Sequence, residues 1–214
     1  MIRIALALVA LLSQDDSSKP PKDAIILFDG KDTSHFTQKD GKPCAWTIVD
    51  GALEVGKGDI ITKETFQDFQ LHVEFNIPEP PEGAKGQARS NSGVYIQRRY
   101  EVQVLDSLGD DPPKFDGCAS IYRQKAPDKN VAKKPGEWQT YDITFRGARF
   151  DASGKKTEGA RITVVWNGVK VHDDYEITGK TGAGQPEGAE PGPILLQDHG
   201  AKVRFRNLWI VPKK

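Results

Sequence analysis

Short segments in which apolar and polar residues alternate run through most of this chain. The clearest is Phe69–Ile77, where five apolar residues alternate with four polar ones, among them His72. Because successive side chains of a strand point to opposite faces, this segment predicts a strand with one buried face and one solvent-facing face that includes His72. Glu137–Arg146 and Val203–Val211 alternate in the same way.

Two Asx-Gly pairs mark hairpins between further strands. Asp50-Gly51 lies in the middle of Trp46–Val55, and Asn167-Gly168 in the middle of Ile162–Val171. Such pairs favour type I′ turns, in which both central residues have positive φ. Shorter apolar runs predict four more strands: Ala24–Phe28, Ile60–Thr62, Cys118–Tyr122 and Ile194–Gln197.

No helical periodicity is sustained beyond the N-terminal segment, so we expect an all-β protein. Strands that bury one face each need a second sheet to cover that face, which predicts a two-sheet sandwich. The predicted strands fall within residues 24–214, a length that suits one domain of this kind, and we therefore predict a single β-sandwich domain there.

The N-terminus differs from the rest of the chain. Arg3 precedes the apolar run Ile4–Leu12, and a polar stretch follows it. This layout predicts a secretory signal peptide at residues 1–13 and a polar tether at 14–23, with a first core helix as the alternative. Nine apolar residues are too few to span a bilayer, so we expect a secreted or periplasmic protein with no transmembrane span after signal removal.

The charge balance argues against a strongly charged partner. The chain has 30 basic and 30 acidic residues, which disfavours nucleic acid or an anionic membrane as the ligand. The two cysteines, Cys44 and Cys118, could pair after export or could simply be small buried residues, and the sequence leaves both open. The four histidines are scattered, so no metal motif is present, although a divalent cation remains possible. His172 is expected at a solvated strand end.

The stretch Asn91–Asp106 contains two strands whose polar faces can meet. Val94 and Ile96 form the apolar face of the first strand, and Val102 and Val104 that of the second. If both strands lie in one sheet, four polar side chains share its other face: Tyr95, Gln97, Glu101 and Gln103.

Asp106 follows this strand directly. Strict alternation places it on the apolar side, but a β-bulge near Val104-Leu105 would turn it toward Glu101. Two carboxyl groups on one face are the minimum for acid/base chemistry on a sugar. The alternative is a solvated strand face with Asp106 as a loop cap.

A second group of polar residues ends the apolar strand near the C-terminus. Gln197, Asp198 and His199 come just before Gly200. Histidine is the side chain whose ordinary pKa lies closest to neutral pH, so a histidine at this position could act as a general base or bind a sugar hydroxyl. An ordinary turn with a surface histidine is the alternative.

The spacing Glu101-x-Gln103-x-x-Asp106 resembles the Glu-x-Asp-x-x-Glu strand of family 16 glycoside hydrolases, in which the outer pair are nucleophile and acid. Here Gln103 replaces the central Asp, and the shorter Asp106 replaces the last Glu. A retaining mechanism needs carboxyl groups about 5–5.5 Å apart, so these two departures disfavour an ordinary glycosidase.

Several stretches together resemble the 3-keto-disaccharide hydrolase domain family. They occur in order along the chain: Leu27–Ser34, Trp46–Gly51, Asn91–Tyr95, Tyr100–Asp106, Gly192–Gly200 and Phe205–Ile210. The resemblance covers roughly residues 24 to 212. It implies a concanavalin A-like jelly-roll sandwich, an exported location and a carbohydrate substrate.

The chemistry that this resemblance implies is cleavage of a 3-keto-glycoside. The 3-keto group acidifies the C2–H bond, so a base can form an enolate and an acid can protonate the leaving oxygen at C1. We expect a base (Glu101 or His199), an acid (Asp106) and groups that hold hydroxyls or the enolate oxygen (Asn91, Tyr95, Gln103). Further substrate contacts are expected from Gln97, Gln197 and Asp198. The rival functions are a non-catalytic carbohydrate-binding module of the same fold and a family 16-like glycosidase.

Overall fold

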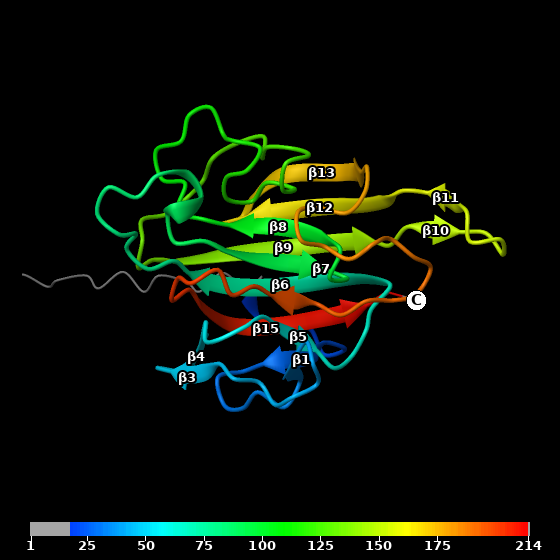
Figure 1. Ribbon diagram of the computed structural model, residues 1–214, viewed down its shortest axis with the longest axis horizontal. Coiled ribbons are helices and arrows are strands. Elements are labelled where there is room, and N and C mark those ends of the chain that lie inside the picture. The colour runs from blue at the N-terminus through cyan, green and yellow to red at the C-terminus, as the bar shows by residue number, and fades with distance from the viewer. Residues whose placement is uncertain (1–17, 214) are drawn as a thin grey trace, which may run out of the picture.

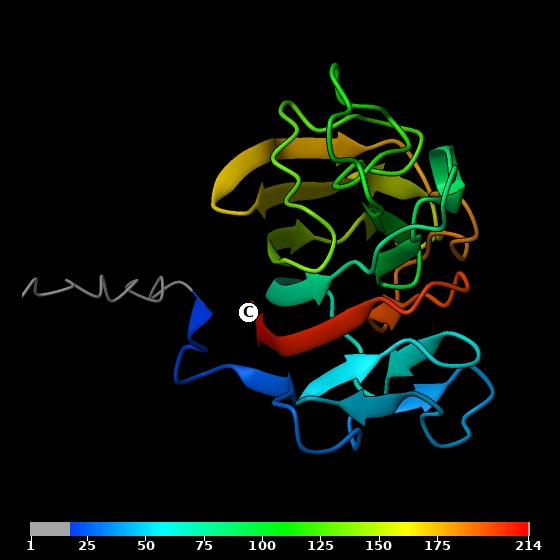
Figure 2. The same ribbon diagram turned by 90° about the vertical axis from the view of Figure 1, so that its left-hand side faces the viewer.

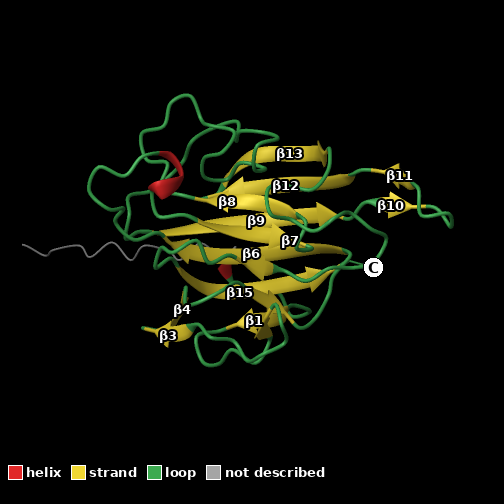
Figure 3. Cartoon of the chain, viewed as in Figure 1, coloured by secondary structure: helices red, strands yellow, loops and turns green. Residues whose placement is uncertain are grey.

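Strands make up nearly all the regular structure of the protein (Figure 3). The computed structural model describes residues 18–213, so the predicted signal peptide and the first residues of the tether lie outside the described part. The elements are β1 (Ile25–Phe28), β2 (Phe36–Gln38), β3 (Thr47–Val49), β4 (Ala52–Glu54), β5 (Ile60–Thr62), β6 (Asp68–Asn76), η2 (Gly86–Ala88), β7 (Ser92–Ile96), β8 (Tyr100–Val104), β9 (Trp138–Arg146), β10 (Arg149–Phe150), β11 (Lys156–Glu158), β12 (Ala160–Trp166), β13 (Val169–Ile177), β14 (Leu195–Leu196) and β15 (Arg204–Pro212).

The larger sheet has eight strands in the order β13-β12-β9-β6-β15-β4-β3, with β1 also pairing to β15. At its centre the two nine-residue strands β6 and β9 pair antiparallel over their whole length, from Asp68 opposite Arg146 to Asn76 opposite Trp138. Figure 1 shows these strands as one broad layer. A short ribbon of β10 and β11 extends from one end of this layer.

The smaller sheet has five strands in the order β2-β5-β14-β7-β8, and it covers the inner face of the larger sheet. β7 and β8 overlie β6 and β9 in Figure 1. The ring of Tyr100 on β8 meets that of Phe145 on β9 with centroids 5.7 Å apart, which joins the two layers. The structure thus confirms the predicted all-β, two-sheet sandwich.

The core lies between the sheets and follows the alternation of the sequence. On β6 the odd-numbered apolar residues from Phe69 to Phe75 are at most 1% exposed, and on the smaller sheet Val94, Val102 and Val104 are fully buried. Burying an aliphatic or aromatic side chain contributes about 1.5–3 kcal/mol, so this interior fixes which face of each strand points outward.

Three tight turns fix the registers of the hairpins. Asp50 and Gly51 have φ of 52° and 73°, and Asn167 and Gly168 have φ of 49° and 79°, which confirms both predicted type I′ turns. The β7–β8 hairpin has a three-residue loop without glycine, and its first two residues, Gln97 and Arg98, are also left-handed, with φ of 52° and 57°. Left-handed conformations of non-glycine residues cost of order 1 kcal/mol each, so contacts elsewhere must hold this turn.

The prediction that His72 faces solvent is wrong, although the alternation put it on the correct face of β6. A bulge in β15 at Arg206–Trp209, where Asn207 has φ of 47°, brings Trp209 directly opposite His72. The two rings stack with centroids 5.0 Å apart, and His72 Nδ1 donates a hydrogen bond to Asp142 Oδ1 at 2.6 Å. The outer face of the larger sheet is therefore covered at this point, and His72 is buried.

Other local predictions also need correction. Residues Cys118 to Tyr122 form turns with a single bridging residue, Ile121, and no strand. His172 is fully buried rather than solvated, and its Nε2 bonds the carbonyl oxygen of Ala119 at 2.7 Å. Burial lowers the pKa of His172 to about 4.

Both cysteines are free thiols. Cys118 is fully buried behind β8, and burial raises its pKa to about 11. Cys44 is partly exposed in a different loop. The structure thus decides between the two open interpretations in favour of small, partly or fully buried residues.

The chain enters the described structure on the outer face of the larger sheet. The carbonyl oxygen of Ser18 accepts hydrogen bonds from Asn207 Nδ2 at 2.8 Å and from Trp209 Nε1 at 3.4 Å. The described end of the predicted tether therefore lies against β15. Among residues 18–213, no helix has the length and apolar character needed to cross a membrane.

Candidate active site

The outer face of the smaller sheet carries the candidate site. β7 and β8 pair without a register shift, which places Tyr95 opposite Glu101 and Gly93 opposite Gln103. Because their neighbours Val94 and Val102 point into the core, these residues point outward. The next strand of the sheet, β14, leads into Gln197, whose N–H bonds the carbonyl oxygen of Gly93 at 3.0 Å.

A cavity of about 310 Å³ opens over this floor. Loops from four parts of the chain form its walls. Its lining residues are Gln87, Asn91, Tyr95, Glu101, Gln103, Tyr122, Arg123, Gly182, Ala183, Gln197 and His199. The structure thus brings together six of the nine predicted site residues: Asn91, Tyr95, Glu101, Gln103, Gln197 and His199.

Glu101 is the buried carboxyl group of this cavity. It is 3% exposed, and the hydroxyl of Tyr95 donates a hydrogen bond to its Oε2 at 2.8 Å. Burial raises the pKa of Glu101 to about 7, because the single Tyr95 hydrogen bond only partly compensates the lost hydration of the charged form. A carboxyl group with this pKa can accept and return a proton at neutral pH.

Two glycines bring backbone close to the Glu101 carboxyl group. A Cβ atom on Gly93 would lie 2.7 Å from Oε1, and one on Gly182 would lie 3.2 Å from Oε2. Gly182 also has a φ of 39°, which side chains rarely adopt. Larger residues at these positions would displace the carboxyl group or fill the cavity beside it.

A chain of side-chain amides forms one wall. Gln87 Nε2 donates to the carbonyl oxygen of Asp116, so its Oε1 is free to accept from both Asn91 Nδ2 and Gln103 Nε2, each at 2.9 Å. This arrangement fixes the orientation of all three amides. Asn91 Oδ1 is left buried without a partner in the described chain.

Gln197 presents a second unpaired oxygen. Its Nε2 donates to the Tyr95 hydroxyl at 3.4 Å, while its Oε1 is buried and has no partner among residues 18–213. Buried polar atoms are normally hydrogen-bonded, so unpaired oxygens that line a cavity are available to accept hydrogen bonds from a ligand. Together with the Glu101 carboxyl group, these amide oxygens favour a ligand rich in hydrogen-bond donors, as a sugar is.

Arg123 and Tyr122 form the opposite wall. The N–H of Tyr122 bonds the carbonyl oxygen of Glu101 at 3.1 Å, which fixes this loop to β8. Arg123 adopts a left-handed φ of 57°, and its guanidinium lies 5.4 Å from the centre of the Tyr122 ring. An exposed guanidinium at the rim supplies positive charge and planar donors to a ligand oxygen.

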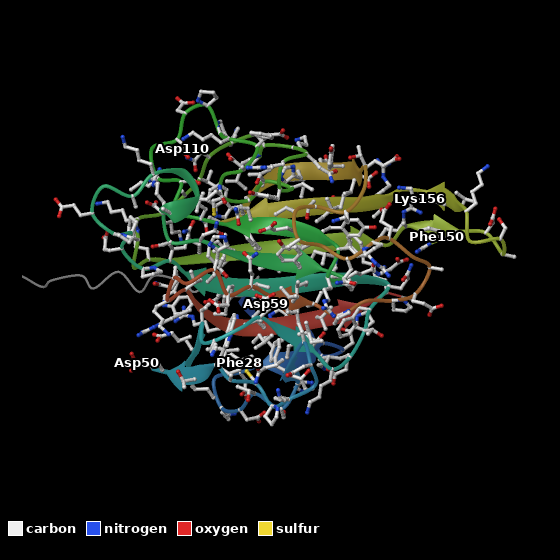
Figure 4. The ribbon with its side chains drawn as sticks, viewed as in Figure 1. Phe28, Asp50, Asp59, Asp110, Phe150 and Lys156 are labelled. Carbon is white, nitrogen blue, oxygen red and sulfur yellow. The ribbon has the colours of Figure 1, made fainter. Side chains whose placement is uncertain are left out.

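The prediction that a bulge brings Asp106 beside Glu101 is wrong. β8 is regular through Val104, and Asp106 Oδ2 instead accepts hydrogen bonds from Arg89 Nη2 at 2.8 Å and Nε at 3.1 Å. Arg89 also reaches Asp110, the loop residue labelled in Figure 4. Asp106 is buried in this ion pair and is not among the residues that line the cavity.

Gln97 and Asp198 also lie outside the cavity. Gln97 sits in the left-handed turn after β7, so its side chain leaves the strand face, and its Nε2 donates to the carbonyl oxygen of Phe66 at 2.8 Å. Asp198 accepts hydrogen bonds from the N–H groups of Gly58 and Gly200. Its own N–H bonds Asp59, labelled in Figure 4. Both residues hold loops in place next to the site.

Five lining residues were missed at the sequence level: Gln87, Tyr122, Arg123, Gly182 and Ala183. All come from loops, whose approach to a strand depends on tertiary contacts. The Gly- and Pro-rich composition of residues 178–193 marks a loop, but nothing local shows that this loop reaches the Glu101 carboxyl group. Within the described chain, no group of three or more His, Cys, Asp or Glu side chains is arranged to hold a metal ion.

The family of this chain is shown by comparison with known proteins. Residues 23–211 match the family described as 3-keto-alpha-glucoside-1,2-lyase-like domain. The chain belongs to this family. A search of the curated proteins found no match.

Solved structures agree with this family membership. A protein of Parabacteroides distasonis ATCC 8503, assigned as a glycosyl hydrolase, is 40% identical with a TM-score of 0.83, and the alignment covers 90% of this chain and 85% of that protein. Two other proteins of that strain carry the same assignment. One is 26% identical with a TM-score of 0.61 over 89% and 99% of the two chains, and the other is 20% identical with a TM-score of 0.68 over 94% and 98%. The family and the first of these relatives support a carbohydrate-active hydrolase or lyase.

Proposed function

We propose that the protein cleaves the glycosidic bond of 3-keto-α-glucosides by elimination across C1 and C2. One observation carries the proposal, namely a buried Glu101 with a pKa of about 7 on the floor of a sugar-sized cavity whose walls present unpaired acceptors. The family description supports the 3-keto-glucoside substrate, and the relative assigned as a glycosyl hydrolase supports action on a glycosidic bond.

The first step is removal of the C2 proton. Ionised Glu101 takes this proton, and the electron pair of the C2–H bond passes into the C3 carbonyl group to give an enolate. Arg123 lines the same cavity, so its guanidinium is placed to stabilise the negative oxygen. Tyr95 holds the Glu101 carboxyl group through its hydrogen bond and thereby orients the base.

The second step expels the leaving group. The enolate electron pair forms the C1=C2 double bond, the C3 carbonyl group returns, and the C1–O bond breaks. His199 lines the cavity near its mouth and donates a proton to the departing oxygen, which leaves as an alcohol. The products are an unsaturated 3-keto sugar and the alcohol, with no net change in oxidation state.

Addition of water to the C1=C2 bond then gives the free 3-keto sugar. His199, which has lost its proton, takes one from water as the water oxygen bonds to C1. C2 regains a proton from Glu101, whose proton exchanges with solvent once the alcohol has left, so the sum of both stages is hydrolysis. Asn91 and Gln197 accept hydrogen bonds from sugar hydroxyls through their unpaired amide oxygens.

Isotope incorporation tests this sequence of steps. Methyl 3-keto-α-glucoside and its unoxidised parent are each incubated with the protein in D₂O, with an enzyme-free control for spontaneous exchange. We expect turnover of the oxidised glucoside alone and deuterium at C2 of the product. Equal turnover of both compounds with hydrogen retained at C2 would identify an ordinary glycosidase, and binding without turnover would identify a carbohydrate-binding module.

We also propose that the protein is exported, on the basis of Arg3 and the apolar run Ile4–Leu12. N-terminal sequencing of protein recovered from its native cell envelope or medium should begin between about Ala10 and Ser18. An intact Met1 on such protein contradicts export.

A further inference from the structure

A second, larger groove opens beside the candidate site. Its volume is about 620 Å³, twice that of the cavity over Glu101. The loop that contains η2 forms one wall, with Pro78, Pro81 and Ala88, and the turn after β14 forms the other, with Ala201. Apolar atoms predominate on its surface.

The groove and the cavity are continuous. Gln87, Asn91 and His199 line both of them, so a ligand bound over Glu101 can extend past these three residues into the groove. His199 therefore stands at the junction. In the proposed reaction the proton donor must be next to the bond between sugar and leaving group, which places that bond at the junction and the leaving group in the groove.

The opposite end of the cavity cannot hold a leaving group. Tyr95, Ala183 and Gln197 lead there into a pocket of only about 60 Å³. This small pocket is closed by charged side chains, including the Lys39–Asp59 ion pair at 2.7 Å. A group larger than a few atoms therefore has protein surface to cover on the His199 side and not on this one.

The chemistry of the groove favours an apolar occupant. Its charged members are Glu79 and Lys202, and the Lys202 ammonium already donates to the carbonyl oxygen of Val55 at 2.9 Å. Of its other polar members, Gln87, Asn91 and His199 stand at the junction with the cavity, and Ser90 is buried. A second sugar would bring several hydroxyl groups that need partners, whereas the proline and alanine surfaces gain by covering apolar carbon.

We infer that this groove binds the leaving group of the substrate and selects glycosides with an apolar aglycone over disaccharides. The inference rests on the proposed function for its orientation of the sugar. It names a substrate class, since the 3-keto sugar occupies the polar cavity and an alkyl or aryl alcohol occupies the groove.

The test compares cyclohexylmethyl and methyl 3-keto-α-glucosides. Both release primary alcohols of similar acidity, so a difference between them reports binding of the apolar group and not leaving-group reactivity. Roughly tenfold in kcat/KM is expected for each 55 Å² of apolar surface that the groove covers, which predicts a preference of about 10- to 100-fold for the cyclohexylmethyl compound. A 3-keto-disaccharide should behave like the methyl compound.

Ala88→Asp and Ala201→Asp place a charge in the groove from its two walls. Each should reduce the cyclohexylmethyl-to-methyl preference at least fivefold, because the carboxylate must be desolvated or must exclude the ring. Ala152→Asp, in the exposed turn between β10 and β11 at the far end of the molecule (Figure 1), is the matched control and should keep the preference of the wild type. Turnover of the methyl compound reports whether each variant is folded.

The outcomes separate this inference from the proposed function. Equal kcat/KM for the two compounds in the wild type, or a preference that both groove variants retain, overturns the inference and leaves the function standing. If neither compound is turned over, the proposed function is wrong. The preference of the groove is then measured as the ratio of the dissociation constants of the two glucosides. If the wild type binds the cyclohexylmethyl compound more tightly and the groove variants abolish this preference, the groove site is supported. If the wild type shows no such preference, the groove site is overturned.

Discussion

Glu74 and Glu101 are buried carboxyl groups on the outer faces of opposite sheets, and they differ in their partners. Glu74 on β6 accepts hydrogen bonds from Arg206 at 2.7 Å and Asn207 at 2.9 Å and lies 3.8 Å from His72. Although burial raises it, these contacts bring the pKa of Glu74 down to about 2. Glu101 on β8 has one side-chain donor in the described chain, Tyr95, and its pKa is raised to about 7.

The difference is the one expected between a structural carboxylate and a carboxyl group with the catalytic role proposed for Glu101. Several donors and cations around a buried carboxylate lower its pKa, so the group stays charged at neutral pH and joins the strands that carry its partners. A buried carboxyl group with one donor changes its protonation state near neutral pH. Proton transfer requires such a change, whereas it contributes nothing to the stability of the fold. Incomplete pairing, and not burial alone, is therefore the feature that supports the proposed role of Glu101.

The largest expected effect is on catalysis at Glu101. Glu101→Gln keeps the shape of the side chain but cannot take a proton, so kcat on a 3-keto-α-glucoside should fall by roughly 10²–10⁴. Glu74→Gln, the matched change on the opposite face, should leave kcat per folded molecule within about twofold. Similar losses of kcat in both variants would contradict the assignment of the catalytic role to Glu101 and of a purely structural role to Glu74.

The order of the two variants should be reversed for the free energy of unfolding, because Glu74→Gln should lose more stability than Glu101→Gln. Glu74→Gln leaves His72 and Arg206 without their shared carboxylate and should cost about 3 kcal/mol in urea unfolding at neutral pH. Glu101→Gln removes a group that is destabilised by burial and should be neutral or slightly stabilising. A Glu101→Gln protein that is less stable than Glu74→Gln would assign a structural role to Glu101.

Stability should fall as the pH rises through the range set by His72. Burial lowers its pKa, but the hydrogen bonds to Asp142 and Glu74 outweigh this and raise it to about 9 from an ordinary value of 6.5. The contribution of the protonated ring is thus complete below about pH 6.5 and lost as the pH passes 9, a change of up to about 3 kcal/mol. Urea unfolding at pH 6 and pH 9.5 measures it, and His72→Gln should lack this part of the slope.

A smaller effect is expected from Tyr95→Phe. The hydroxyl stabilises ionised Glu101, so its loss should move the midpoint of the rise in kcat/KM, near pH 7 in the wild type, upward by up to roughly one pH unit. The rate at pH 9 should remain within about tenfold of the wild type. An unshifted pH profile would show that Tyr95 acts on the substrate and not on Glu101.

The smallest effect concerns the amide wall. Gln103→Ala removes one of the two amides that anchor Gln87, and it should raise KM several-fold while kcat changes by less than about twofold. A fall in kcat at constant KM would instead place Gln103 at the reacting atoms.

Alternation predicted the floor of the site because the opposite face of each strand is core. Val102 and Val104 had to be buried, so Glu101 and Gln103 had to point outward, and the structure places them so. The fold was predictable for the same reason. Asp106 was misplaced because its partner, Arg89, comes from a loop with no periodic pattern.

His72 and the cavity walls illustrate what a local pattern does not contain. His72 is buried by a bulge at Asn207, more than 130 residues away in the chain. Nothing in the sequence of β6 predicts this bulge. Arg123 and Gln87 reach the site through loop conformations that backbone hydrogen bonds fix, such as that from Tyr122 to Glu101. Long-range contacts of this kind decide which polar residues meet.

The contacts of Ser18 have a practical consequence for joining the protein to a label, a tag or a solid support. Because its carbonyl oxygen is bound by Asn207 and Trp209, the chain departs from the outer face of the larger sheet, and Figure 2 shows the start of the described chain and η2 on opposite sides. A fluorescent label, an affinity tag or a solid support joined directly to Ser18 is therefore attached on the face opposite Glu101. Immobilised in this orientation, the protein would keep its cavity and groove open to dissolved glycosides.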